Sequence, residues 1–258
     1  MARSFLAFLI GEAGLSPWVF LGLCATTFVG SLIAASIGLG GGVLVLAVMA
    51  QVFAPAVLIP LHGVVQFGSN AGRAALMFRR AVFGIVPAFA VGTVIGSIVG
   101  ANLFVALPVW LLQLVLALFV LYATWAPSFQ PRTGAKGTFF GVGLVSGFIT
   151  LFIGGSAPFV APFVRAACAD RREFVATVAV FMVLQHGVKI AAFGALGFAF
   201  GPYLPLLAVL LVCGFCGTVS GRLLLERLPE RVFAVGLKIV LTVLAARLLY
   251  AASRAILA

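Results

Sequence analysis

A stripe of polar residues interrupts the apolar segment 57–78 of this sequence. His62, Gln66, Asn70 and Arg73 recur at intervals of 4, 4 and 3 residues, a spacing that places all of them on one face of an α-helix. Hydrogen-bonding and charged side chains inside an apolar segment commonly mark a water-filled cavity or a substrate path. The stripe therefore predicts a polar cavity lined by this helix face.

A second polar stripe lies in segment 173–198. Thr177, Gln185 and Lys189 share one helix face, and His186 stands beside Gln185. Lys189 is near the middle of the segment, where a lysine costs about 2.5–3.5 kcal/mol on membrane-insertion scales. Such a charge needs a partner or water at that depth, so the position predicts a counter-ion for the lysine.

The acidic residues do not supply that counter-ion. All five of them lie at segment ends or in the gaps between segments: Glu12, Asp170, Glu173, Glu226 and Glu230. A bound anion is therefore the natural partner of Lys189, and the two stripes predict a site for an anionic substrate. The structural alternatives are a lysine that donates to backbone carbonyls and glutamines that form hydrogen bonds between helices.

Two glycine clusters stand at breaks between apolar segments. Gly38-Leu-Gly-Gly-Gly42 and Gly154-Gly-Ser-Ala-Pro158 should interrupt a membrane helix, because glycine permits turns that other residues resist. Non-helical backbone inside a bilayer must be buried in protein or line a wet cavity. Helices that restart at these clusters would present free N–H groups and positive dipole ends to an anion. The alternative is that the glycines only permit tight helix packing.

These observations define one predicted site for a small anion. Its predicted substrate-binding residues are Gly40, Gly41, Gly42, Gln66, Asn70, Arg73, Gly155, Ser156, Gln185 and Lys189. His62 and His186 are the candidates for proton coupling, because histidine titrates near neutral pH; a neutral histidine held by a hydrogen bond is the alternative for each. Arg73 lies about five residues from the end of its segment and could instead reach the membrane surface. No cofactor and no metal is expected.

The composition indicates the medium in which these residues lie. Of the 258 residues, 64% are hydrophobic and only 8% are charged, whereas a soluble domain carries roughly 25% charged residues. No soluble fold of this size covers so much apolar surface, so we predict an all-α integral membrane protein. The formal net charge of +11 is spread over the gaps between apolar segments, a distribution that sets membrane orientation and argues against a nucleic-acid partner.

The apolar segments form two sets of five with the same order of lengths. They lie at 17–37, 42–53, 57–78, 82–105 and 108–126, and at 137–153, 157–167, 173–198, 203–223 and 231–251. The second segment of each set is too short to span about 30 Å of hydrocarbon. Each set is therefore predicted to begin with a glycine-broken helical hairpin, either fully spanning or re-entrant. Residues 1–126 and 137–258 are two predicted transmembrane repeats, joined by a cytoplasmic hinge at 127–136.

Gaps that contain basic residues alternate along the chain with gaps that contain none. The gaps with Lys or Arg begin after residues 78, 126, 164 and 221, and those without them lie near 54–57, 106–108 and 199–205. The positive-inside rule places the basic gaps in the cytoplasm and both termini on the outer side. The two sets then run in opposite directions, which makes an inverted repeat of the kind common in secondary transporters. The corresponding residues are Gly40 and Gly155, Gln66 and Gln185, and Asn70 and Lys189.

Other motifs fit this sequence poorly. A dinucleotide fingerprint that began at Gly38 would need a glycine where Val43 stands. A soluble-style hydrolase is not predicted, because the membrane segments contain no acidic residue for a catalytic triad. Cysteine and histidine spacing gives no zinc site, and the N-terminus has no convincing signal peptide. Cys213-x-x-Cys216 leaves a membrane thiol-redox relay as an alternative function.

The glycine patterns resemble those of the TauE/SafE family of sulfite and organosulfonate exporters, also called the 4-toluene sulfonate uptake permease family. The resemblance rests on Gly38-Leu-Gly-Gly-Gly42 with the short apolar helix after it, on Ile153-Gly-Gly-Ser156 leading to Pro162, and on the glycine-rich stretch 92–101 echoed at 214–223. It covers nearly the whole chain. The second copy departs from the family's G-x-G-G-G, because Ser156 and Ala157 stand where glycines would.

The resemblance implies transport of small sulfur-containing or carboxylate anions across a prokaryotic plasma membrane. Together with the polar stripes it predicts a secondary transporter, rather than an enzyme, that exports sulfite, an organosulfonate or a related organic acid by alternating access around a site in the middle of the membrane. An anion channel with the same site is the alternative. The predicted partners are the lipid bilayer and the small anion, and the oligomeric state is left open.

Overall fold

The computed structural model describes residues 14–104, 107–126, 131, 136–224 and 230–257. Over those residues the chain forms ten α-helices and no strand, which confirms the predicted all-α fold. The α-helices are α2 (Pro17–Ile37), α3 (Gly41–Met49), α4 (Pro55–Met77), α5 (Val86–Phe104), α6 (Val109–Trp125), α7 (Lys136–Ile153), α8 (Ala157–Ala167), α9 (Arg171–Ala195), α10 (Leu204–Leu224) and α11 (Glu230–Leu257). Short 3₁₀ helices cover Phe78–Arg80, Phe83–Ile85 and Gly201–Tyr203.

Local sequence signals set where several helices begin. Ser16 caps α2 by accepting a hydrogen bond from the Val19 N–H, and Asp170 caps α9 by accepting one from the Glu173 N–H. A capping oxygen satisfies one of the free N–H groups in the first helical turn. Pro55 occupies the first turn of α4, where its missing N–H removes no helical hydrogen bond.

Five helical stretches are long and apolar enough to span a membrane: Pro17–Ile37, Phe83–Phe104, Arg171–Ala195, Gly201–Leu223 and Val235–Arg254. The chain is therefore a multi-pass membrane protein, as predicted. Helix α4 is also long enough, with 23 residues, but its polar stripe lowers its mean hydropathy. Helices α3 and α8 have only 9 and 11 residues, so neither spans the hydrocarbon core alone.

Both short helices follow a break at glycine, as the sequence predicts. Gly38 ends α2 with φ 93°, Gly40 precedes α3 with φ 89°, and Gly154 ends α7 with φ 74°. These values lie in the left-handed region that residues with a Cβ rarely adopt. The conformations therefore explain why glycine stands at these turns and why α2–α3 and α7–α8 are broken hairpins.

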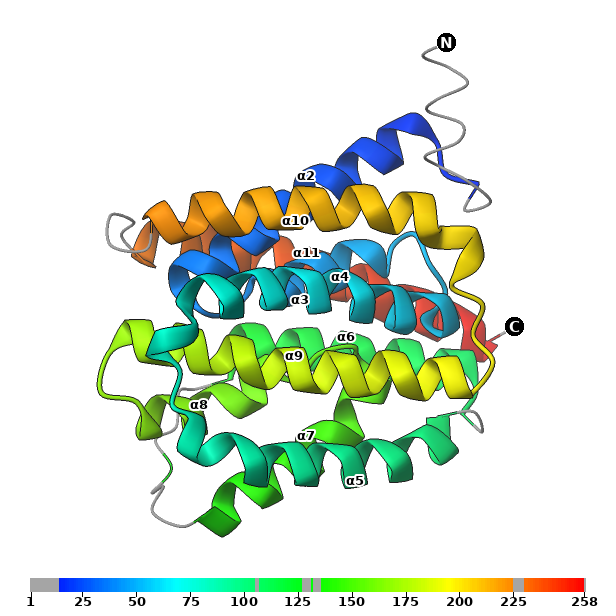
Figure 1. The fold of residues 1–258 in the computed structure, drawn as a ribbon. Coiled ribbons are helices and arrows are strands. Elements are labelled where there is room, and N and C mark those ends of the chain that lie inside the picture. The colour runs from blue at the N-terminus through cyan, green and yellow to red at the C-terminus, as the bar shows by residue number, and fades with distance from the viewer. Residues whose placement is uncertain (1–13, 105–106, 127–130, 132–135, 225–229, 258) are drawn as a thin grey trace.

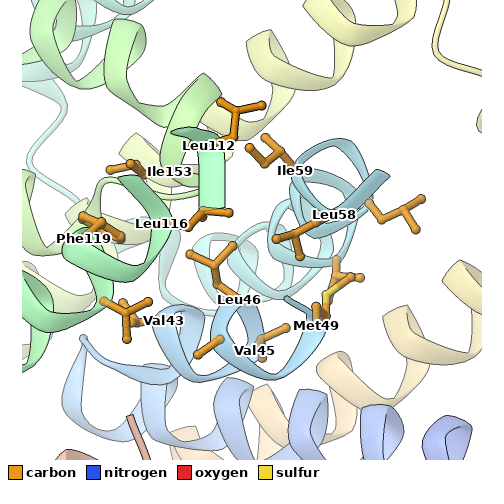
Figure 2. Close-up of a cluster of buried hydrophobic side chains, with 14 of the residues drawn as sticks. Val43, Val45, Leu46, Met49, Leu58, Ile59, Leu112, Leu116, Phe119 and Ile153 are labelled. Atoms are coloured by element: carbon orange, nitrogen blue, oxygen red, sulfur yellow. The ribbon is translucent and has the colours of Figure 1, made fainter. Parts of the chain in front are cut away.

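Helix α3 is embedded in the protein rather than exposed to lipid. Figure 2 shows its side chains among those of three other helices, with Leu58 and Ile59 from α4, Leu112, Leu116 and Phe119 from α6, and Ile153 from α7. Val45, Leu46 and Met49 of α3 are each about 1% exposed. A turn at membrane depth is tolerated only where protein or a cavity surrounds it, and this packing meets that condition for the α2–α3 turn.

The long helices lie side by side in a layered bundle (Figure 1). Helix α4 packs against α9 at the centre, α10 packs on the other side of α4, and α5 packs on the other side of α9. The outer helices have partners of their own, because α2 contacts α10, α7 contacts α5 and α11 contacts α6. Helices α4 and α9, which carry the two polar stripes, therefore lie side by side in the middle of the molecule.

Glycines hold the outer helix pairs at backbone contact. A Cβ at Gly92 or Gly96 of α5 would overlap the carbonyls of Phe140 or Leu144 in α7. A Cβ at Gly217 of α10 would likewise overlap the carbonyl of Phe28 in α2. Small residues permit such close approach between membrane helices. A Cβ at Gly100 would likewise crowd the Phe148 carbonyl, so these α5 glycines form a packing groove for α7.

Candidate functional site

A cavity of about 40 Å³ lies where the two broken hairpins meet α4 and α9. Its polar wall combines one helix face of α4, the two glycine turns and one residue of α9. The lining residues are Ala34, Gly38, Leu39, Gly40, Gly42, Val43, Leu46, His62, Gln66, Asn70, Arg73, Phe119, Gly155, Ala157, Pro158, Val178, Met182 and His186. Segments far apart in the sequence thus supply one site.

The α4 stripe is buried and lines this cavity along its whole length. His62, Gln66, Asn70 and Arg73 are each 5% exposed or less. The spacing of 4, 4 and 3 residues puts them on one face, and the packing of α9 and α10 against α4 turns that face inward. The cavity predicted from this stripe is therefore present.

Arg73 is the cation of the cavity wall. Its guanidinium donates hydrogen bonds to the Ala34 carbonyl at the end of α2 and to Asn70 Oδ1, and it is 4% exposed. Its Nε has no hydrogen-bond partner among the described residues. The sequence left open that this arginine reaches the membrane surface, whereas the structure buries it with one donor unsatisfied.

The first broken hairpin presents a helix N-terminus to the cavity. The Leu44 N–H bonds the Gly40 carbonyl, so the N–H groups of Gly41, Gly42 and Val43 before it have no helical acceptor. A Cβ at Gly42 would stand 3.1 Å from Gln66 Oε1, so this position faces the α4 stripe. Free N–H groups and the positive dipole end favour an anion here.

The second broken hairpin approaches the cavity in the same way. Helix α8 begins at Ala157, and Pro158 occupies its first turn, as the sequence predicts. Gly155, Ala157 and Pro158 line the cavity. A Cβ at Gly155 would stand 3.6 Å from His62 and 4.0 Å from His186, so this turn lies directly against both histidines.

Three predicted site residues stand behind the cavity rather than on its surface. Lys189 is fully buried and its ammonium donates to the Gly154 carbonyl. Ser156 donates a hydrogen bond to Gln185 Oε1, which holds the start of α8 against α9. These three side chains of the second half thus fix the glycine turn, whereas Gly155 and the polar stripe of α4 line the cavity itself.

Gly41 also points away from the cavity. A Cβ at this position would overlap the Gly30 carbonyl of α2, so Gly41 brings the two arms of the first hairpin into backbone contact. Its role in the structure is the close packing that was the alternative interpretation of the glycine clusters. Gly40 and Gly42, its neighbours, line the cavity.

The apolar wall was missed by the sequence prediction. Val178 and Met182 of α9 line the cavity together with His186, and Leu46 and Phe119 close it from α3 and α6. A signal for the first pair was available, because residues 178, 182 and 186 are four apart and share one helix face. Without His186 to identify the cavity-facing side of α9, nothing in the sequence distinguishes Val178 and Met182 from the other apolar residues of that helix.

The described acidic side chains lie away from this site. Asp170 and Glu173 are both at the N-terminus of α9, and neither lines the cavity. The N–H of Glu173 donates to the Asp170 carboxylate and lowers the pKa of that group. Lys189 therefore has no carboxylate partner among the described residues, as its sequence context predicts; its partner is the Gly154 carbonyl.

Cys213 and Cys216, the pair on which the alternative redox function rests, lie on α10 away from the cavity. Cys213 lies near Cys24 of α2, across the α2–α10 contact. Cys216 is exposed one helical turn further along α10. All four cysteines are free thiols, and the cavity contains none of them.

A comparison with known families identifies the family of the chain that forms this cavity. The sequence profile described as "Sulfite exporter TauE/SafE" matches residues 23–248, a range that includes both glycine turns and every cavity-lining residue. The chain belongs to the TauE/SafE family. This TauE/SafE protein is thus a membrane transporter of a sulfite and anion export family, as its glycine patterns predict.

Two further searches gave no relatives for this TauE/SafE protein. Neither the curated proteins nor the solved structures contained a match.

Proposed function

We propose that this TauE/SafE protein is a secondary transporter that exports a small oxyanion, such as sulfite, a small organosulfonate or a related organic acid, by alternating access around the cavity. The observation that supports this proposal is the buried Arg73, which shares the cavity with two helix N-termini. Each of the three favours negative charge, and they converge on one volume from α4, α3 and α8.

The balance of charge around the cavity supports an anion over a cation or a neutral solute. Arg73 lines the cavity, Lys189 lies one layer behind it, and the described acidic residues are elsewhere. A buried guanidinium with an unsatisfied Nε leaves a donor for an oxygen of the substrate. Gln66, whose amide bonds no other described residue, and the free N–H groups of α3 add neutral donors.

The volume of the cavity favours the smaller members of the substrate class. About 40 Å³ has room for roughly three water molecules, which suits a sulfur atom with its oxygens better than an aromatic sulfonate. The apolar residues Leu46, Phe119 and Met182 limit growth of the ligand on the remaining sides. We therefore place sulfite ahead of bulkier sulfonates in the expected order of affinity.

The helix contacts support the inverted repeat on which alternating access would rest. When α2–α6 are matched in order with α7–α11, the contact of α2 with α10 corresponds to that of α7 with α5. The contact of α4 with α10 corresponds to that of α9 with α5, and α4 with α9 and α6 with α11 each correspond to themselves. Residues 1–126 and 137–258 are accordingly proposed as the two repeats; the proposed hinge, 127–136, lies almost entirely outside the described residues.

Thiol labelling tests the proposed orientation, with both termini outside. In a variant without its four native cysteines, Arg80→Cys should resist a membrane-impermeant thiol reagent in intact cells and react after permeabilisation. Leu204→Cys should react in intact cells, because the gap before α10 carries no basic residue. Both positions are exposed. The reverse pattern would show that the basic gaps face outward and would overturn the orientation.

Counterflow in proteoliposomes tests the proposed transport activity and separates it from a channel. Vesicles preloaded with unlabelled sulfite should accumulate labelled sulfite transiently above its equilibrium level, because a carrier exchanges one bound anion for another. Methanesulfonate should compete, and 4-toluenesulfonate should compete less because of its size. A flux that neither saturates nor shows counterflow would support the channel alternative, and no flux at all would refute transport of sulfite.

A further inference from the structure

The ring of His62 bridges the two broken hairpins. Its Nδ1 lies 3.0 Å from the carbonyl oxygen of Gly154, and its Nε2 lies 3.0 Å from the carbonyl oxygen of Gly42. Gly42 belongs to the first turn of α3, whereas Gly154 lies between α7 and α8. The imidazole is therefore the one side chain described here that contacts the glycine turns of both halves through hydrogen bonds.

Both of these contacts call for a donor on the ring. A neutral imidazole has one N–H and one lone pair, so it donates through a single nitrogen. A carbonyl oxygen only accepts, and a ring lone pair held 3.0 Å from it forms no bond and repels it. Two hydrogen bonds to two carbonyls are satisfied together only by the imidazolium, which carries an N–H on each nitrogen. The geometry is that of a protonated His62.

The neighbours of His62 oppose that positive charge when the cavity is empty. Two titratable groups face the ring from α9: His186, whose ring centroid is 6.0 Å away, and Lys189, which donates to the same Gly154 carbonyl. Arg73 lines the same cavity from α4 itself. Among the described acidic side chains none lines the cavity to compensate them. At low effective dielectric these like charges repel strongly.

An anion in the cavity supplies the missing negative charge. His62 lines the cavity directly, so a bound oxyanion would lie beside its ring and offset the repulsion from Lys189 and Arg73. Charge on the ring would in turn strengthen anion binding, because coupling between two binding events is reciprocal. Proton and anion then occupy the protein together.

We propose that His62 takes up one proton when the anion binds and thereby clamps the two glycine turns together. In the proton- and anion-loaded protein the imidazolium donates to Gly42 and Gly154 and holds the broken hairpins in contact. Loss of the proton leaves one nitrogen lone pair against a carbonyl, so this clamp weakens as the anion leaves. The inference rests on the proposed anion transport. It adds that His62 carries one proton for each anion that binds.

The role belongs to His62 rather than to His186. The Nδ1 of His186 has no hydrogen-bond partner, and this ring bridges no pair of carbonyls among the described contacts. His186 instead packs edge-on against His62. The sequence could not separate the two histidines, since both stand in polar stripes; the carbonyls that surround each ring do so.

Nitrogen NMR of the histidine rings tests this inference directly. The chain has two histidines, so protein labelled with ¹⁵N in histidine gives the signals of two rings, and a His186→Gln variant assigns them. The protein is titrated between about pH 6 and 8, without anion and at saturation with sulfite. At a pH at which the His62 ring is neutral in the anion-free protein, sulfite should convert it to the imidazolium.

Calorimetry provides the second measurement and separates the possible failures. Sulfite itself titrates, and this makes its affinity for any variant depend on pH. Dividing the sulfite affinity of the wild-type protein by that of His62→Gln removes this shared pH dependence. The ratio should rise by up to about tenfold for each unit of decrease in pH. Sulfite binding with a His62 ring whose protonation is unchanged at every pH would overturn this inference alone. Absence of sulfite binding at every pH would overturn the proposed function and this inference with it.

Discussion

Replacing Gly42 with leucine is expected to abolish anion transport while the protein still inserts and folds. The glycine lies in the first turn of α3, and a Cβ there would already stand 3.1 Å from Gln66 Oε1. The remaining leucine carbons would extend into a cavity of only about 40 Å³ and cover the free N–H groups at the helix start. Sulfite counterflow in proteoliposomes should fall below detection, a loss of more than about 100-fold in uptake rate.

Gly141→Leu is the matched control for this experiment. Gly141 also lies in a membrane helix, α7, but a Cβ there would meet nothing within 4 Å. The control adds the same side chain away from the site, so its transport should stay close to that of the wild type. Normal counterflow by the Gly42→Leu protein would show that the anion does not pass between α3 and α4, and the proposed site would be wrong.

Replacing Arg73 with methionine is expected to weaken sulfite binding by about 10- to 150-fold. A hydrogen bond to a charged group is worth roughly 1.5–3 kcal/mol, which corresponds to that range of affinity. Methionine retains most of the buried apolar stem and removes the guanidinium. The Ala34 carbonyl keeps its bond from the Gly38 N–H at 3.0 Å, so the end of α2 should not unravel. Calorimetry on the purified, monodisperse variant measures the dissociation constant.

Arg79→Met removes the same charge from a position outside the cavity. Arg79 is exposed just after α4, six residues from the site arginine, and this change should alter the dissociation constant less than twofold, because exposed charges are screened by solvent. An Arg73→Lys variant should recover only part of the binding, since an ammonium does not reproduce the planar fork of donors. Equal affinities for the Arg73→Met and wild-type proteins would leave Arg73 as a cap on α2 and remove the main support for an anionic substrate.

Much of this architecture can be predicted from patterns in the amino-acid sequence. Apolar segment lengths predict the helices within a few residues, because the bilayer imposes a length that a soluble core does not. The turns at Gly38–Gly40 and Gly154 are predictable because only glycine adopts their positive φ readily. The inward face of α4 is predictable because its polar residues have no stable place in lipid.

The arrangement inside the site does not follow from such patterns. Helix periodicity assigns Lys189 and Gln185 to a polar face of α9, but the rotation of α9 against the second hairpin decides that they bond Gly154 and Ser156. Arg73 is buried because α2 ends beside it and offers the Ala34 carbonyl, a contact across 39 residues. The proximity of Cys24 to Cys213 likewise depends on the packing of α2 and α10. These contacts depend on how the helices pack against one another, which the pattern within each helix does not determine.

The embedding of α3 constrains how the protein is made. Helix α3 follows α2 early in synthesis, yet its side chains pack on α4, α6 and α7, and Gly40 beside it lies against Leu237 of α11. With 9 residues it cannot hold a place in hydrocarbon before those partners arrive. We therefore expect the first hairpin to reach its final place only after α11 has been synthesised. Truncation before α11 should accordingly leave a full set of translated site residues without an assembled site.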